Sequence, residues 1–138
     1  MYSYIEPEVS GEIGDNTIVD TFVHPPRVLK LHYQFDGWLG DDLLETFPCY
    51  IVSSSLAKKI ELAQLTGFVL GDVEISKSKQ FEELYPKKEL PNFYWLKVIG
   101  KAGKDDFGIS EDYRLIVSSK AINTLQKGKI EMADLEAL

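Results

Sequence analysis

The chain has 138 residues, of which 44% are hydrophobic and 27% charged. That length and composition suit one globular domain, and no run approaches the roughly 20 apolar residues that a membrane span needs. The single cysteine, Cys49, excludes an internal disulfide and a zinc site built from cysteines. The first residues show neither the basic nor the apolar region of a signal peptide, so we expect a cytoplasmic protein.

The formal net charge of −7 is concentrated at one end of the chain. Residues 1–50 contain nine carboxylates, whereas Arg27 and Lys30 are their only lysine or arginine cations. An acidic surface repels nucleic acid and membranes and attracts basic partners. The same charge is also common in domains that it merely keeps soluble, so the charge alone leaves both interpretations open.

The first half of the chain reads as a polar arm followed by a strand and a turn. Residues 1–26 are interpreted as an irregular acidic arm, with a short strand near 17–22 and a break at Pro25-Pro26. Apolar and polar residues then alternate over 29–36, which predicts a half-buried strand with His32 on its polar face. The segment GDDLLETFP (40–48) is interpreted as one short helical turn.

The sequence IVSS occurs twice, at 51–54 and at 116–119. Each copy follows an apolar strand pattern and precedes a short amphipathic helix that a glycine ends, Gly67 in one case and Gly128 in the other. We expect Ser54 or Ser55 to cap the first helix and Ser118 or Ser119 the second, each cap contributing about 1 kcal/mol. The two segments therefore predict two similar strand-cap-helix units.

The remaining patterns complete the fold prediction. Residues 68–75 and 91–100 read as strands, the second of them dense in aromatic and β-branched residues. Together the elements predict a single α+β domain over residues 1–138. It should contain a mainly antiparallel sheet of five to seven strands and two or three short helices.

The serines do not fit a hydrolase, which needs a strained elbow such as G-x-S-x-G, a histidine base and an orienting carboxylate. Neither IVSS is flanked by glycine. Asp106-Phe107-Gly108 matches a kinase motif, but the other kinase motifs are missing, so the match is interpreted as chance. Asp41-Asp42, Asp105-Asp106 and Asp112 lack calcium-loop spacing and are more simply solvated loop carboxylates. We expect no cofactor and no metal.

Exposed aromatic residues beside carboxylates point to protein recognition instead. In Phe93-Tyr94-Trp95 an alternating strand sends side chains to both faces, so at least one aromatic ring should face outward. Trp38 lies between Gly37 and the carboxylates that follow it. The alternative is that covering elements bury these rings. The candidate partner-binding residues are Trp38, Asp41, Asp42, Asp36, Glu45 and Tyr94.

The chain contains in order GDDLLETFPCYIVSSSLAKKIELAQLTGFVLGDVEIS, LPNFYWLKVIG and KDDFGISEDYRLIVSSKAINTLQ. These segments resemble the small immunity proteins of bacterial polymorphic-toxin systems over about residues 35–130. The related double-CxxCG proteins carry paired cysteine motifs, which a chain with one cysteine lacks. The resemblance implies a cytoplasmic antidote that binds and blocks one cognate toxin domain, often a basic one, encoded beside it.

Three classes of function follow from these observations. The first is a non-enzymatic antidote that neutralises a toxin domain by protein–protein contact, with an acidic surface that speeds association. The second is an enzyme with an unrecognised acidic site built from Asp41, Asp42, Asp105, Asp106 and His32, which a shared deep pocket would favour. The third is a small-ligand-binding or scaffold module, which an apolar cavity would favour.

Overall fold

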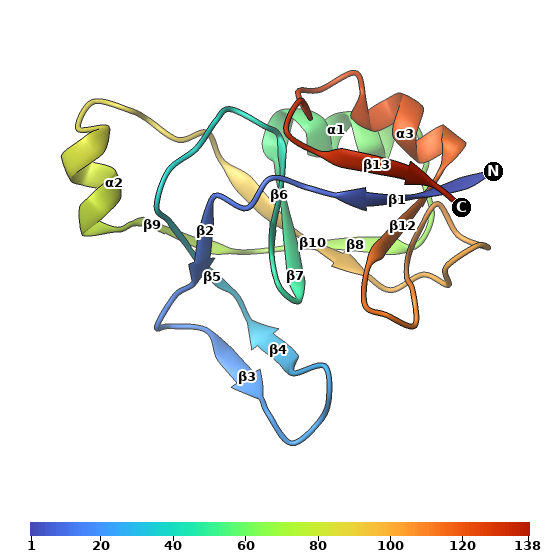
Figure 1. Cartoon of the computed structure of the whole chain (residues 1–138), viewed down its shortest axis with the longest axis horizontal. Coiled ribbons are helices and arrows are strands. Elements are labelled where there is room, and N and C mark those ends of the chain that lie inside the picture. The colour runs from blue at the N-terminus through green and yellow to red at the C-terminus, as the bar shows by residue number, and fades with distance from the viewer.

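A computed structural model describes all 138 residues and shows an α+β fold with thirteen strands and three helices (Figure 1). The strands are β1 (Tyr2–Glu6), β2 (Gly11–Ile13), β3 (Ile18–Asp20), β4 (Arg27–Lys30), β5 (His32–Phe35), β6 (Leu43–Thr46), β7 (Cys49–Ser53), β8 (Phe68–Gly71), β9 (Glu74–Lys77), β10 (Phe93–Val98), β11 (Phe107–Ile109), β12 (Leu115–Ser118) and β13 (Asp134–Ala137). The helices are α1 (Ser54–Leu62), α2 (Lys79–Leu84) and α3 (Ser119–Leu125). The predicted α+β class is confirmed, with more and shorter strands than expected.

The strands form three sheets and one separate hairpin. Sheet A has the order β11-β12-β1-β13, sheet B the order β6-β7-β10-β8, and sheet C the order β2-β5-β9. The hairpin β3-β4 pairs with no other strand and projects from the body of the molecule (Figure 1). All pairings between two of these strands are antiparallel except that of β5 with β9, so the prediction of a mainly antiparallel sheet structure is also confirmed.

Sheets A and B are two copies of one arrangement. The first unit consists of β1, β6, β7, α1 and β8, and the second unit of β10, β11, β12, α3 and β13, in the same chain order. The first unit places β6, β7 and β8 in sheet B and its first strand, β1, in sheet A. The second unit places β11, β12 and β13 in sheet A and its first strand, β10, in sheet B. The exchanged strands have equivalent partners, because Phe93 pairs with Ser53 and Tyr2 pairs with Ser118. The two predicted units are therefore halves of an interlocked structural repeat.

The first serine of each IVSS caps the helix that follows. The Ser53 hydroxyl accepts a hydrogen bond from the Leu56 N–H at 3.2 Å, and the Ser118 hydroxyl accepts one from the Ala121 N–H at 3.0 Å. The expected second cap is confirmed as Ser118, whereas the expectation of Ser54 or Ser55 for the first helix is wrong by one residue. Ser54 already belongs to the helix, since the extended strand β7 continues through Ser53.

An aspartate supports each capping serine. Ser53 donates a hydrogen bond to Asp42 Oδ1 at 2.8 Å, and Ser118 donates one to Asp106 Oδ1 at 2.6 Å. The other oxygen of each carboxylate binds the segment after the helix of the opposite unit: Asp42 accepts from the Lys129 N–H and Asp106 from the Thr66 N–H. Each cap is thus tied to the end of the other unit's helix, which links the two halves of the repeat.

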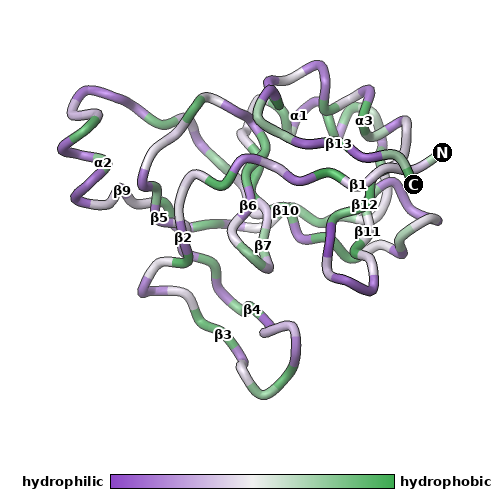
Figure 2. The backbone as a smooth tube through the Cα atoms, viewed as in Figure 1, coloured by the Kyte–Doolittle hydropathy of each residue, from purple (hydrophilic) through white to green (hydrophobic).

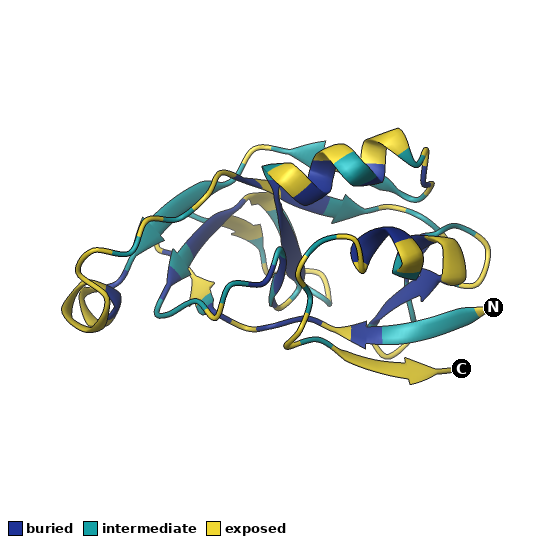
Figure 3. Cartoon of the chain, turned by 90° about the horizontal axis from the view of Figure 1, so that it is seen from above, coloured by how far each residue is buried: buried dark blue, intermediate teal, exposed yellow.

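Two apolar cores lie on opposite faces of sheet B. The first is enclosed by sheets A and B and by helices α1 and α3, with Ile5, Leu56, Leu96 and Phe107 among its buried members. The second lies between sheet B and sheet C and centres on Tyr33, Phe35, Phe81 and Phe93. Figure 3 shows the buried strands between these layers and the exposed strand β13 at the margin. Sheet B is therefore the central layer of the molecule.

Two further local predictions are wrong, for different physical reasons. Residues 1–26 are not an irregular arm, because β1 pairs with β12 and β13 from the far end of the chain. Residues 43–46 form strand β6 rather than a helical turn. Leu43 faces the first core and Leu44 the second, so a strand buried on both faces loses the alternating pattern.

The strand predicted over 29–36 is interrupted at Leu31. Leu31, Tyr33 and Phe35 are buried as the alternation predicts. Leu29 and His32 depart from it, because the two parts of the segment have different surroundings. Leu29 is 55% exposed on the projecting hairpin, whereas His32 is only 6% exposed. The His32 ring lies within 2.7 Å of the Ser76 hydroxyl through Nε2 and accepts a hydrogen bond from the Asn16 N–H at Nδ1.

Candidate partner-binding surfaces

Trp38 is part of the second core's margin rather than a free aromatic anchor. It is half-buried, and its ring packs edge-on against Phe93 with 6.1 Å between the ring centres. The indole N–H donates to the Asp41 carbonyl at 2.9 Å, and the Lys88 ammonium lies 5.5 Å from the ring centre. These contacts fix the ring within the fold, so replacing Trp38 would disturb the loop that carries it.

Asp41 is completely buried, and its carboxylate binds backbone N–H groups. Its two oxygens accept hydrogen bonds from the N–H groups of Glu131 and Met132 at 3.1 and 2.8 Å. Burial raises the pKa of the Asp41 carboxyl, and the nearby charge of Glu8 raises that pKa further. With Asp42 engaged by Ser53 and Lys129, both members of the predicted acidic pair hold the fold together, and Asp41 has no surface to offer a partner.

The other three predicted contact residues reach the surface in three different hollows. Asp36 lines a shallow depression beside Gly37, and Glu45 lines another beside Glu6. Burial raises the pKa of Glu45, and the charge of Glu6 adds to that effect. Tyr94, which is 40% exposed, lines a groove next to β9. The prediction that one ring of 93–95 faces outward is confirmed, since Phe93 and Trp95 are buried.

Glu8 is a buried carboxylate that the sequence did not reveal. It accepts hydrogen bonds from the Ser10 hydroxyl and from the N–H groups of Leu39 and Asp41. It therefore organises the turn that contains Trp38. The only sequence signal was its place among the nine carboxylates of residues 1–50, and nothing distinguished it there from the exposed ones.

The five residues considered for an acidic active site serve separate structural purposes. Asp41 and Asp42 hold the segment after α3, whereas Asp106 holds the segment after α1. Asp105 accepts from the Lys101 N–H within its own turn, and His32 is tied to β9 through Ser76. The repeat places the two aspartate pairs at equivalent positions in opposite units, and the structure does not gather the five side chains in one pocket.

The hairpin surface is the set of exposed apolar side chains on β3, β4 and their connection, namely Ile18, Val19, Phe22, Val23 and Leu29. Phe22 is 100% exposed at the tip. Figure 2 shows the hydrophobic colouring of this tip, which stands away from the body of the molecule. The base of the tip is held by the edge-on contact of His24 with Tyr113, whose ring centres are 5.3 Å apart.

A groove of about 540 Å³ lies under the hairpin. One wall comes from residues 25–29, and the other comes from sheet B and its neighbours, including Trp95 and Ile99. Lys97 crosses the Trp95 ring with its ammonium 4.5 Å from the ring centre. Ile99 is itself exposed and lines the groove together with Leu29 of the hairpin surface, so exposed apolar side chains lie on both of its walls. Exposed apolar surface is typical of interaction sites when it is extensive.

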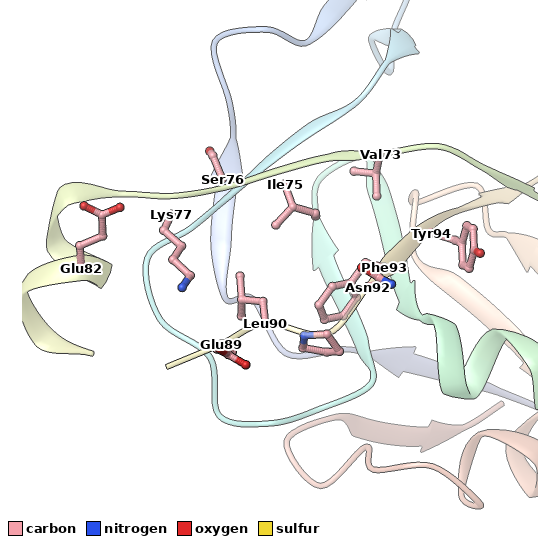
Figure 4. A pocket seen from close by; sticks show the side chains of 11 residues that line it. Val73, Ile75, Ser76, Lys77, Glu82, Glu89, Leu90, Asn92, Phe93 and Tyr94 are labelled. Carbon is pink, nitrogen blue, oxygen red and sulfur yellow. The ribbon is translucent and has the colours of Figure 1, made fainter. Parts of the chain in front are cut away.

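A second groove, of about 810 Å³, separates β9 from residues 89–94 (Figure 4). Its apolar lining comes from Val73, Ile75, Leu90 and Phe93. Lys77, Glu82 and Glu89 provide the charged groups. Both grooves border segments that lie outside the elements of the two repeat units.

No family model, no curated protein and no solved structure matches this chain. No helix in the structure is long and apolar enough to cross a membrane.

Proposed function

We propose that the protein is a non-enzymatic antidote that binds one toxin domain and neutralises it by protein–protein contact. The observation that carries this proposal is the hairpin surface, where five large apolar side chains project from the body and contribute to neither core. Exposed aromatic and aliphatic groups on a projecting element are energetically useful when a partner buries them. The resemblance to immunity proteins supplies the class of partner.

The charge of the chain favours a basic toxin. The net charge is −7, and several carboxylates near the amino terminus are at the surface, among them Glu6, Glu12, Asp15 and Asp20. Like-charged surfaces repel and opposite ones accelerate encounter, so an acidic antidote would find a basic toxin quickly at low salt. In this proposal the hairpin surface supplies most of the binding energy, and the acidic surface increases the association rate. The site of action would be the cytoplasm.

The first experiment is co-expression with the product of the neighbouring gene, followed by co-purification and a growth-protection assay. Binding by the wild-type protein, with association that slows as salt increases, supports the proposal. Failure of the neighbouring product to bind or to be neutralised would contradict it.

The second experiment tests the hairpin with Phe22→Ala. Phe22 is fully exposed, so the variant should unfold at the wild-type temperature while the complex dissociates roughly 30-fold faster, as expected for a hot spot of about 2 kcal/mol. Leu62→Ala is the matched control, because Leu62 is 84% exposed on α1, away from the hairpin. A Phe22→Ala protein that binds as tightly as the Leu62→Ala control would exclude the hairpin as the contact surface.

A further inference from the structure

The groove between β9 and residues 89–94 has strand edges as its walls. β8 pairs with β10 only from Trp95 to Val98, and the chain then passes through Asp72 and Val73 into β9, which joins sheet C. The pairing of β8 with β10 therefore stops two residues short of Phe93, whose partner in that register would be Val73. The two strands diverge at this point, and Figure 4 shows the groove that opens between them.

Both edges have free backbone groups directed at the groove. Glu74 and Ser78 donate their N–H groups to Leu31 and Phe35, so the even-numbered residues of β9 face β5. Because successive residues of a strand direct their N–H and C=O groups to opposite sides, those of Ile75 and Lys77 point away from β5.

The same reasoning applies to β10. The Asn92 carbonyl accepts from the Ser54 N–H, so Asn92 and Tyr94 face β7 and the backbone groups of Phe93 face the groove. Sheet edges with free donors and acceptors are templates for another strand.

The available charge in the groove is negative. The Lys77 ammonium is engaged, because it donates to the Lys88 carbonyl at 2.6 Å and lies 5.3 Å from the centre of the Phe81 ring. Glu82 and Glu89 are exposed and form no ion pair. A strand lying here would place alternate side chains on the apolar lining and beside these carboxylates.

We propose that this groove binds an extended segment of a partner protein, with alternating apolar and basic residues, by adding it as a strand to the free edge of β9. The proposal rests on the proposed function for the identity of the partner, namely the toxin domain. Backbone pairing with Ile75, Lys77 and Phe93 gives the geometry, and Glu82 and Glu89 select lysine or arginine. The hairpin and the groove are then two contact regions for one toxin.

A peptide experiment tests the groove without the toxin. The probe is acetyl-Lys-Val-Lys-Val-Lys-Val-amide, titrated into the full-length protein while amide hydrogen exchange is followed residue by residue. We expect the exchange of Ile75, Lys77 and Phe93 to slow at least tenfold, and the acidic analogue with glutamate in place of lysine to have no effect. Unchanged exchange at these three amides with millimolar basic peptide, or protection at other residues only, would overturn the proposal.

The charge selection is tested with the double variant Glu82→Lys/Glu89→Lys. Its matched control is Glu61→Lys/Glu83→Lys, which changes the net charge equally at two exposed positions outside the groove. We expect peptide affinity to fall at least tenfold in the first variant and less than threefold in the control. Equal losses in the two variants would mean that overall charge, and not the groove, attracts the peptide, and would overturn the proposal.

The same exchange measurement on the complex with the neighbouring gene's product identifies the occupant. Protection of Ile75, Lys77 and Phe93 supports the toxin segment. If the complex forms and the toxin is neutralised while these amides remain unprotected, this inference is overturned and the proposed function still stands. No complex at all contradicts the proposed function, and the peptide result still decides the groove. Protection of these amides in the concentrated protein alone would assign the groove to a second copy and overturn the proposal.

Discussion

The outer faces of sheets A and B differ although the two sheets are copies of one arrangement. The outer face of sheet B is covered by sheet C, which creates the second core around Phe35. No second sheet covers the outer face of sheet A, where the Arg114 guanidinium lies 3.5 Å from the centre of the Tyr4 ring. The difference comes from two segments, residues 7–41 and 72–92, which contain β2 to β5, β9 and α2.

The same two segments carry both candidate contact regions. The hairpin surface lies in the first segment, and β9 with its groove lies in the second. In the first unit, residues 7–41 lie in the connection from β1 to β6. The equivalent connection in the second unit, from β10 to β11, covers only residues 99–106. The comparison indicates a division of labour in which the repeat supplies a rigid scaffold and the added segments supply recognition.

The largest effects should come from the two cores. Phe107→Ala and Phe35→Ala each remove a fully buried ring, and we expect each to lower the free energy of unfolding by about 3–5 kcal/mol. The two variants should differ in where structure is lost. In Phe35→Ala, amides of sheet C should exchange faster while those of α1, α3 and β12 stay protected, because the repeat has its own core.

Hydrogen exchange on both variants, with denaturant unfolding in parallel, measures this difference. Uniform loss of protection throughout the chain in Phe35→Ala would show that the added layer and the repeat unfold as one unit. The division between scaffold and recognition segments would then not extend to stability.

The next largest effects should come from the aspartates that support the caps. Asp106→Ala removes the acceptor of the Ser118 hydroxyl and of the Thr66 N–H, and we expect a loss of about 1.5–3 kcal/mol. Asp42→Ala removes the equivalent contacts to Ser53 and Lys129 and should cost about the same. Chemical denaturation of both variants compares the two halves. A large loss of stability in one variant and none in the other would contradict the equivalence of the two aspartates.

The pH dependence of the Asp106 effect has a definite sign. Although burial acts to raise its pKa, hydrogen bonds from Ser118 and Thr66 outweigh burial and hold the pKa of Asp106 below its usual value. Its stabilising contribution is therefore fully present above the unfolded-state pKa of about 3.9 and is lost as the pH falls through the folded-state pKa. The stability difference between wild type and Asp106→Ala should shrink in this acidic range, as unfolding measured from pH 6 to pH 2 will show.

Asp41 should show the opposite sign. Its pKa is raised in the folded protein, so its ionised form is penalised at neutral pH and the penalty is relieved as the pH falls through the folded-state pKa. Compared with Asp41→Asn, the wild-type protein should gain stability on mild acidification. If the stability of the wild type and that of the variant depend on pH in the same way, the ionised Asp41 carboxylate is not penalised in the folded protein.

The strand-cap-helix part of each repeat unit could be predicted from the sequence, but strands β1 and β6 of the first unit could not. Both IVSS segments carry their information locally: an apolar strand, a serine that accepts a helical N–H, and an amphipathic helix. The fate of β1 depended on partners more than a hundred residues away, and that of Leu43 and Leu44 on two cores that no local window describes.

The candidate site was harder to predict than the fold. An aromatic residue beside carboxylates, such as Trp38 beside Asp41, is typical of a contact surface. In the structure, however, both side chains form hydrogen bonds with the protein's own backbone. Phe22 ends the segment 17–22, which reads as a short strand, and that local pattern does not show whether the Phe22 ring is buried or exposed. Only the projection of the hairpin makes it a candidate for partner contact.

The smallest effects should come from the capping serines, and they are the strictest test of the repeat. Ser53→Ala and Ser118→Ala each remove one acceptor for a first-turn N–H, and we expect each to lower stability by about 1 kcal/mol. Each substitution also leaves an aspartate oxygen without its hydroxyl donor, but the other oxygen keeps its backbone partner across the repeat. Since neither serine belongs to the hairpin surface or lines the groove beside β9, both variants should bind the partner with wild-type kinetics. Unfolding and binding measured on the same samples separate the two roles. A well-folded serine variant that fails to bind would show that the scaffold and the recognition segments are not independent.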